Sequence, residues 1–382
     1  MAGMHVLTYA EISFGQKVRI KMEIKDKILR EDMEEIAKDP VFAEGFWQST
    51  VFITGATGLL GSQAVWALLY LNRICGSGIK IVAMARSKDK VKKIFGDLSE
   101  GSDLTICYGD INDPISYPGE VDYIIHGASA TSSKYFVSHP AETIRTALDG
   151  TRHILEFAKQ KNITSMVYLS SLEVYGTPHA DQIMLGETDY GYLDPMQARS
   201  SYSEGKRMAE CLCAAYAAEH KVPVKAARLS QTFGAGVDYH DGRVFAEFAR
   251  CVVEGKDIIL HTAGNTVRSY CYTKDAVRAI FYILLRGENQ EAYNVTNMDT
   301  AVSIKEMAEM ACALDPKQTI RVKVEIPEDV SVFGYNPEMV IRLDASKLQK
   351  LGWKPTVGLT EMFRRMIESS FGGAGMVSHR SK

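Results

Sequence analysis

The segment SYSEGKRMAE at residues 201–210 places a tyrosine four positions before a lysine. At this spacing Tyr202 and Lys206 lie one turn apart on the same face of a helix. A lysine ammonium beside a phenol favours the phenolate and so lowers the phenol pKa from about 10. A tyrosine tuned in this way can take a proton from a substrate hydroxyl and return it. The pair therefore predicts acid–base chemistry, provided that other elements bring a cofactor and a substrate to it.

A glycine-rich stretch predicts where a dinucleotide cofactor binds. TGATGLLG at residues 54–61 supplies three glycines between an apolar strand and a helix. The first allows a tight turn, the second lets the backbone approach a pyrophosphate, and the third lets the helix pack closely on the strand. The amides and the dipole of the helix N-terminus favour the same anion. The expected cofactor contacts of this stretch are Gly55, Thr57, Gly58, Leu59, Leu60 and Gly61.

The end of the second apolar strand distinguishes the two nicotinamide cofactors. An acidic residue there would hydrogen-bond the ribose hydroxyls, whereas a basic residue would pair with a 2′-phosphate. In AMARSKDK that position holds Arg86, followed by Ser87, with no acid beside it. The predicted cofactor is therefore NADP or NAD, with Arg86 favouring NADP. The alternative interpretation is a solvated arginine in a surface loop.

These motifs need a scaffold, and the chain between residues 49 and 230 provides one. Apolar strands alternate there with helices, including helices at 62–72 and 143–160. Such alternation predicts an α/β fold, a doubly wound parallel sheet of the Rossmann type covered on both faces. Ligands of such sheets bind at the carboxyl ends of the strands. The expected strands are 49–55, 80–86, 103–110, 121–129, 165–171 and 224–230.

The remaining regions are expected to surround this domain. Residues 1–48 are predicted to form an N-terminal appendage, and residues 231–370 mainly a smaller mixed α/β lobe for substrate. Some segments of that lobe could return to the main sheet. Residues 371–382 are predicted to be a flexible tail.

Composition and charge argue against several classes of binding partner. A formal net charge of -3 argues against a nucleic-acid partner, and no apolar run is long enough for a membrane span. The seven cysteines form no CxxC pair, which is typical of a reduced, cytoplasmic protein. The nine histidines show no ligand spacing, so no metal site is predicted.

Together these motifs resemble the extended short-chain dehydrogenase/reductases, which include nucleotide-sugar epimerases, dehydratases and decarboxylases. The shared features are TGxxGxxG, a serine ending the fifth strand in YLSSLEVYG, and YxxxK. The resemblance implies that Tyr202 is the catalytic acid/base and that Lys206 binds the nicotinamide ribose. It also implies that Ser171 helps to polarise the reacting carbonyl and that Asp110 meets the adenine. Further cofactor contacts are expected from Ile111, Ala128 and Ser129.

Within this family the chain looks most similar to UDP-glucuronate decarboxylases. RSSYSEGKRMAE, DGRVFAEF and VRSYCYTKD resemble their substrate-side segments. The resemblance implies oxidation at C4 of the sugar, loss of CO₂ and return of the hydride, with Glu173 beside the sugar ring as a further catalytic residue. The substrate contacts that it implies are Thr131, Ser132, Glu173, Tyr175, Gln231, Arg243, Arg268 and Arg342. Arg243 and Arg268 would meet the diphosphate, because guanidinium groups suit phosphate oxygens.

Three departures keep other reactions open. Leu172 stands where decarboxylases have a serine and dehydratases an aspartate, Gln231 replaces an asparagine, and Arg342 is only a loose stand-in for an arginine of the decarboxylases. The alternatives are an NADPH-dependent reductase of a nucleotide-linked keto sugar or ketose, a nucleotide-sugar 4-epimerase, and a cofactor-binding protein without turnover. The resemblance further implies a homodimer, in which helices 143–160 and 202–219 form a four-helix interface.

Overall fold

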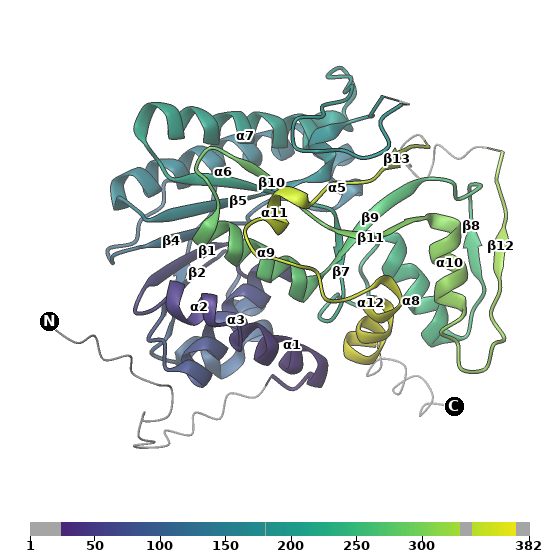
Figure 1. Ribbon diagram of the computed structural model, residues 1–382, viewed down its shortest axis with the longest axis horizontal. Helices are drawn as coiled ribbons and strands as arrows, with labels where there is room; N and C mark the ends of the chain where they lie inside the picture. The colour runs from purple at the N-terminus through teal and green to yellow at the C-terminus, as the bar shows by residue number, and fades with distance from the viewer. Residues whose placement is uncertain (1–23, 180, 329–337, 372–382) are drawn as a thin grey trace, which may run out of the picture.

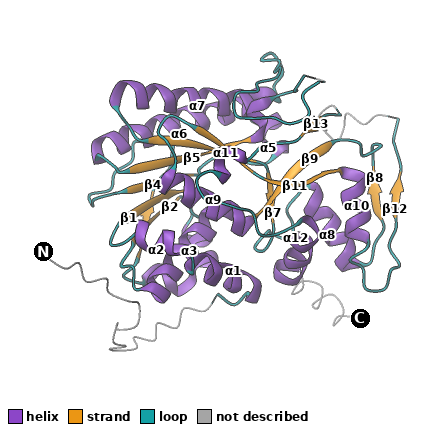
Figure 2. Ribbon diagram, in the orientation of Figure 1, coloured by secondary structure: helices purple, strands orange, loops and turns teal. Residues whose placement is uncertain are grey.

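A parallel sheet of seven strands forms the centre of the computed structural model, which describes residues 24–179, 181–328 and 338–371 (Figures 1 and 2). Its order is β3-β2-β1-β4-β5-β6-β10. All six neighbouring pairs run parallel. The strands are β1 (Thr50–Thr54), β2 (Lys80–Ala85), β3 (Leu104–Tyr108), β4 (Tyr123–His126), β5 (Ser165–Ser171), β6 (Val224–Leu229) and β10 (Ala292–Val295). The predicted doubly wound fold is confirmed.

The strand order creates a crevice between β1 and β4. The chain runs outward from β1 to β3 and then returns to place β4 on the other side of β1, with Thr54 paired to His126. The connections that follow these two strands therefore leave in opposite directions. A ligand site is expected at such a reversal of strand order.

Helices cover both faces of the sheet (Figure 1). On one face α6 (Pro140–Lys161) and α7 (Ser200–His220) lie side by side. On the other face α3 (Leu59–Cys75) packs beside α9 (Thr273–Arg286). Every residue of β1 and all but the last of β5 are buried, because both faces of the sheet are covered.

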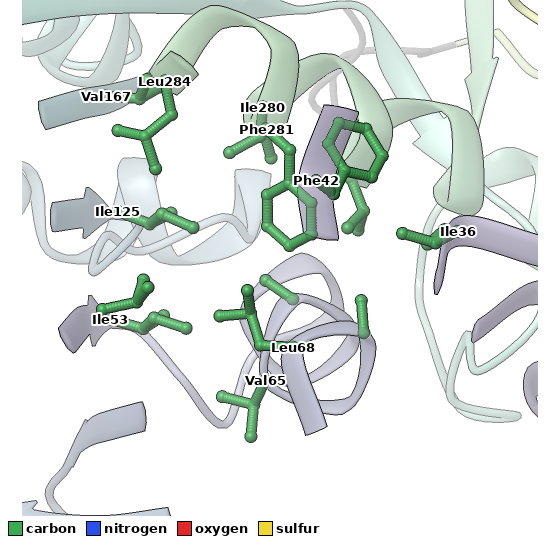
Figure 3. Close-up of a cluster of buried hydrophobic side chains, with 14 of the residues drawn as sticks. Ile36, Phe42, Ile53, Val65, Leu68, Ile125, Val167, Ile280, Phe281 and Leu284 are labelled. Atoms are coloured by element: carbon green, nitrogen blue, oxygen red, sulfur yellow. The ribbon is translucent and has the colours of Figure 1, made fainter. Parts of the chain in front are cut away.

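Figure 3 shows the core between the sheet and α3 and α9. Ile53, Ile125 and Val167 project from three neighbouring strands toward Leu68 of α3 and Phe281 of α9. All five side chains are buried. This core fixes the end of β1, and with it the glycine turn that follows.

The two N-terminal helices pack into this same core. Asp26 caps α1 (Lys27–Ala37) by accepting from the amides of Ile28 and Leu29, and Asp39 caps α2 (Pro40–Gly45). Phe42 of α2 is fully buried and meets the ring of Phe281 edge-on at 5.3 Å. Residues 1–23 lie outside the described residues.

The C-terminal region contributes to both parts of the molecule. Both α9 and β10 belong to the main sheet and its cover, whereas the neighbouring segments build the smaller lobe. That lobe has a sheet of β7 (Gln231–Phe233), β9 (Val267–Tyr272), β11 (Asn297–Ser303) and β13 (Val340–Ile341), and a pair of β8 (Ile258–Leu260) and β12 (Val322–Val324). Its helices are α8 (Val244–Glu254), α10 (Ile304–Cys312) and α12 (Leu359–Met366). Of the predicted tail only Phe371 is described.

The remaining elements are short. They are α4 (Lys88–Phe95), α5 (Ser133–Ser138), α11 (Ser346–Gln349), the short turns η1 (Gly96–Glu100) and η4 (Ile367–Phe371), and a 3₁₀ turn η2 (Leu172–Tyr175) directly after β5. A membrane span would need a longer and more apolar helix than any found in the described ranges.

Candidate active site

A cleft of about 930 Å³ lies at the carboxyl ends of the central strands. Residues after β1, β2, β4 and β5 line it, together with residues of α5 and α7 and with Gln231 and Arg243 from the smaller lobe. The predicted glycine turn and the predicted Tyr–Lys pair therefore open into one space.

The glycine turn leaves no room for side chains at two positions. Gly55 has a φ of +67°, and a Cβ there would lie 2.6 Å from the carbonyl carbon of Gly127. A Cβ at Gly61 would lie 2.2 Å from the carbonyl oxygen of Gly55. Helix α3 begins after Gly58 without a side-chain cap, and its first residues line the cleft, so no capping side chain competes for the amides of its first turn. This close backbone packing fits the pyrophosphate of a dinucleotide.

The end of β2 brings Arg86 beside Asp110. Their closest atoms are 3.4 Å apart, and the Arg86 side chain is 73% exposed, so the pair is weak. Asp110 also accepts from the backbone amide of Asn112 at 2.9 Å. That amide, with Arg86, holds the pKa of Asp110 below its usual range. Both Arg86 and Lys90 line the cleft, which leaves two cations beside the expected adenosine ribose.

The Tyr–Lys pair meets the end of β5. The Nζ of Lys206 donates to the carbonyl of Leu169 at 2.7 Å and lies 5.8 Å from the ring centroid of Tyr202. The Ser171 side chain lies close enough to the Tyr202 phenol to act on its pKa. The Tyr202 ring stacks on Phe136 of α5, with centroids 4.1 Å apart and an interplanar angle of 9°. The three residues expected to act on a hydroxyl are thus gathered at one point of the cleft.

Burial dominates the electrostatics of this pair. It raises the pKa of Tyr202 to about 12, with the Glu173 carboxylate acting in the same direction. Ser171, Arg199 and Arg243 act in the opposite direction. The expected lowering of the phenol pKa is therefore not seen, because desolvation outweighs the nearby cations. Burial also lowers the pKa of Lys206 to about 8.

Glu173 is held beside Tyr202 by two residues that sequence reasoning missed. Its carboxylate accepts from Arg199 at 3.1 Å and from the Ser203 hydroxyl at 3.0 Å. Arg199 stands three positions before Tyr202 and Ser203 one position after it, so both lie near the start of α7. Their closeness to Tyr202 in the sequence could have identified them as candidate site residues. The stacking partner Phe136 carried no comparable signal.

The predicted substrate contacts are divided between the cleft and its surroundings. Thr131, Ser132, Glu173, Gln231 and Arg243 line the cleft. The guanidinium of Arg243 is paired with Asp241 at 2.6 Å. Leu172 lines the cleft as well, although its side chain is 3% exposed.

Three predicted contacts are not among the cleft-lining residues. Tyr175 is fully buried, and its hydroxyl donates to Asn294 at 2.6 Å and accepts from Arg228 at 3.0 Å. Arg268 is buried on β9, where desolvation lowers its pKa. Arg342 is exposed after β13. Tyr175 is held by Arg228 of β6 and Asn294 of β10 in the main sheet, whereas Arg268 and Arg342 belong to the smaller lobe, so contacts between distant segments decide these positions.

The described part of the chain contains no cluster of three or more His, Cys, Asp or Glu residues arranged to hold a metal ion. The polar side chains of the cleft are hydroxyls, carboxylates, cations and the amide of Gln231.

Comparison with known proteins agrees with this geometry. Residues 51–296 match the family described as "NAD dependent epimerase/dehydratase family". The chain is 29% identical over 341 residues to UDP-glucuronic acid decarboxylase 6 of Arabidopsis thaliana, covering 86% of this chain and 91% of the relative. It is 28% identical over 322 residues to UDP-glucuronic acid decarboxylase 1 of Danio rerio, covering 83% and 72%.

Solved structures share the fold. UDP-glucose 4-epimerase of Thermotoga maritima matches with a TM-score of 0.68 at 19% identity, covering 85% of this chain and 99% of the epimerase. The dTDP-glucose 4,6-dehydratase of Bacillus anthracis, solved with NAD, matches with a TM-score of 0.65 at 20% identity, covering 84% and 96%. With the glycine turn, Ser171 and the Tyr202–Lys206 pair in one cleft, the chain belongs to the NAD dependent epimerase/dehydratase family and is an enzyme of the extended short-chain dehydrogenase/reductase type.

Proposed function

We propose that this enzyme decarboxylates a nucleotide-linked uronic acid, with UDP-glucuronate as the first candidate. The observation that carries the proposal is the similarity over most of both chains to UDP-glucuronic acid decarboxylases. The cleft supports it, because Ser171, Glu173 and Tyr202 all line the same wall.

The dinucleotide would be held by the glycine turn and by residues after β2 and β4. We infer a preference for NADP, because Arg86 and Lys90 line the cleft where a 2′-phosphate would need cations. Ala128 and Ser129, which follow β4, would line the nicotinamide end. A bound nicotinamide supplies a hydride acceptor and donor, and its positive charge when oxidised favours a nearby phenolate.

The side chains of the site would move the protons. Tyr202 takes the proton of the C4 hydroxyl as that carbon is oxidised, and Ser171 donates a hydrogen bond to the same oxygen. The product of this step is a β-keto acid. Its carboxylate leaves as CO₂, and the electrons of the broken bond pass to the C4 oxygen, where Tyr202 and Ser171 stabilise the enolate. The enolate then takes a proton at C5 from solvent, and Tyr202 returns its own proton to the C4 oxygen as that carbon is reduced.

The substrate would extend from Tyr202 toward the smaller lobe. Thr131, Ser132 and Gln231 line the part of the cleft that would receive the sugar. Arg243 would meet the diphosphate, exchanging its pair with Asp241 for phosphate oxygens. Arg268, which is buried near Glu173, would add positive charge to that region.

We also propose a homodimer formed through α6 and α7. Ile144 of α6 is 40% exposed and Met208 of α7 is 54% exposed, so this pair of helices presents apolar side chains to solvent. Light scattering at micromolar concentration tests the proposal. A monomeric mass would contradict it.

Two observations favour alternative reactions of the same site. Leu172 offers no hydroxyl to a carboxylated sugar, which favours a 4-epimerase acting on a neutral sugar. Arg86 favours a reductase that consumes NADPH to reduce a nucleotide-linked keto sugar. Both reactions need only Ser171, Tyr202 and Lys206.

One experiment separates these reactions. The purified protein is incubated with UDP-glucuronate labelled with ¹³C at C6 and with NAD or NADP, and the products are followed by mass spectrometry. Release of ¹³CO₂ without net change in the dinucleotide supports the decarboxylase. If the sugar nucleotide is unchanged, decarboxylation of UDP-glucuronate is excluded. Conversion of UDP-glucose to its 4-epimer, or NADPH consumption with a keto sugar, would then identify the alternative. The Tyr202→Phe variant is the control for a contaminating activity.

A further inference from the structure

Three consecutive residues of β5 each contact a polar residue on one face of α7. The pairs are Leu169–Lys206, Ser170–Glu210 and Ser171–Tyr202. The three α7 residues are spaced four apart, so they follow one another along that face of the helix. Two of them belong to the chemistry already described. The third, Glu210, does not line the cleft.

Glu210 is fixed as a carboxylate inside the protein. Ser170 donates to it at 2.5 Å, and Arg228 donates from Nη2 at 2.7 Å and from Nε at 3.0 Å. The Arg228 side chain is 2% exposed, and its remaining donors bond the Tyr175 hydroxyl, the Tyr190 hydroxyl and the carbonyl of Glu187. These bonds hold the Glu210 carboxylate in one position, one helical turn beyond Lys206.

A nearby negative charge matters to Lys206, because burial disfavours the ammonium form of its side chain. The side chain is 4% exposed, and burial lowers its pKa to about 8. On β5 it faces the ring of Tyr168, whose centroid lies 4.7 Å from Nζ. On β4 it faces the buried His126, which is neutral because burial lowers its pKa to about 3. On α7 it faces Tyr202 and the buried Cys213, whose thiol pKa is raised by burial. The ionised group that acts on Lys206 from its own helix is Glu210.

We propose that Glu210 is a positioning residue that keeps Lys206 charged at neutral pH and thereby holds it ready to act on Tyr202. The inference rests on the proposed role of Lys206 in proton transfer. Arg228 and Ser170 serve this purpose indirectly, since they hold the Glu210 carboxylate in place. A neutral Lys206 would lose the electrostatic effect on the phenol and would weaken its hydrogen bond to Leu169.

The test is a direct titration of Lys206 that needs no substrate. Protein labelled with ¹³C in lysine is titrated by NMR, and the Lys206 Cε signal is assigned with the Lys206→Arg variant. In Glu210→Gln the midpoint of this titration is expected to fall by about one pH unit. Glu219→Gln, an exposed carboxylate further along α7, is the matched control and should leave the midpoint unchanged.

A second variant keeps the test decisive if Glu210→Gln leaves Arg228 unpaired and does not fold. Glu210→Gln/Arg228→Met removes both charges together, which buried ion pairs often tolerate, and it should show the same fall in the Lys206 midpoint. An unchanged midpoint in the variant that folds would overturn the inference.

Once a turnover assay exists, the alkaline limb of the pH–rate profile should move by the same amount as the Lys206 midpoint. A merely structural Glu210 would lower stability and leave both midpoints in place. Because the titration uses no substrate, its failure is distinct from a failure of the decarboxylase proposal.

Discussion

The carboxylate of Glu173 and the guanidinium of Arg199 lie 3.1 Å apart, although 26 positions separate them in the sequence. Glu173 lies in the 3₁₀ turn that follows β5, and Arg199 directly precedes α7. Their contact closes this long connection beside Tyr202. The residue expected beside the sugar ring therefore contacts the N-terminal end of the same helix that carries Tyr202 and Lys206.

This contact predicts a measurable coupling. Both side chains are less than one-quarter exposed, so the pair should contribute more than a solvated one. A double-mutant cycle with Arg199→Met and Glu173→Gln is expected to give a coupling energy of about 1 kcal/mol in urea unfolding. The exposed pair Lys27–Glu31, 3.7 Å apart, is the matched control and should give a value near zero. Equal values for the two pairs would contradict the prediction.

Tyr202→Phe should separate catalysis from folding. The phenylalanine ring preserves the stack on Phe136 and removes only the hydroxyl that reaches Ser171. Turnover is expected to fall by about 10²- to 10⁴-fold, while dinucleotide binding, followed by fluorescence, stays within about threefold. Tyr216→Phe removes a hydroxyl on the same helix that bonds Glu156, and it should leave turnover unchanged. Near-normal turnover by Tyr202→Phe would refute its role as acid/base.

Gly61→Ala should abolish dinucleotide binding. Its Cβ would meet the carbonyl oxygen of Gly55 at 2.2 Å, so either the helix or the turn must move. Gly358→Ala is the matched control, because it also stands at the start of a helix and its Cβ would meet nothing within 4 Å. Isothermal calorimetry with NADP and NAD measures both variants. Wild-type affinity in a folded Gly61→Ala protein would contradict the predicted role of the turn.

Arg86→Ala tests the proposed cofactor preference. Loss of one charged partner of a 2′-phosphate costs about 1.5–3 kcal/mol, which corresponds to roughly 10- to 100-fold weaker NADPH binding. NADH binding should change by less than about threefold, since that cofactor lacks the phosphate. Lys92→Ala removes an exposed cation of α4 that does not line the cleft, and it serves as the control. An equal loss for both cofactors would argue against the preference.

Asp32 predicts a pH-dependent stability outside the cleft. It is fully buried between Tyr272 and Arg365, and burial raises its pKa to about 6 from 3.8. Because the folded-state pKa is the higher one, the stabilisation from its proton is complete below about pH 4 and is lost as the pH rises through about 6. Over this range the loss amounts to about 3 kcal/mol.

Comparison with Asp32→Asn isolates this effect from the other carboxylates. The free energy of unfolding of the wild type, minus that of the variant, should fall between pH 4.5 and pH 7 in urea titrations. A difference that does not depend on pH would show that Asp32 titrates normally.

The elements that carry the chemistry could be predicted because their patterns are local. Helix α7 was expected at 202–219 and spans Ser200–His220, so the four-residue spacing of Tyr202 and Lys206 does place them on one helical face. The glycine turn was equally readable, since a strand, three spaced glycines and a helix follow directly in the chain. In both cases backbone geometry alone relates the residues.

Contacts between distant segments decided the rest. Nothing in the local pattern brings Arg199 to Glu173, stacks Phe136 on Tyr202, or buries Phe42 of the N-terminal region against Phe281. Burial itself is a property of the whole fold, and it raises the pKa of Tyr202, whereas the sequence had suggested the opposite. The sequence by itself determined the glycine turn and the placement of Tyr202 and Lys206 on one helical face, since these depend on turn geometry and helix period. Only the tertiary structure decided which side chains contact Tyr202 and Glu173, how deeply they are buried, and which residues line the rest of the cleft. These features depend on side chains brought together from separate parts of the chain.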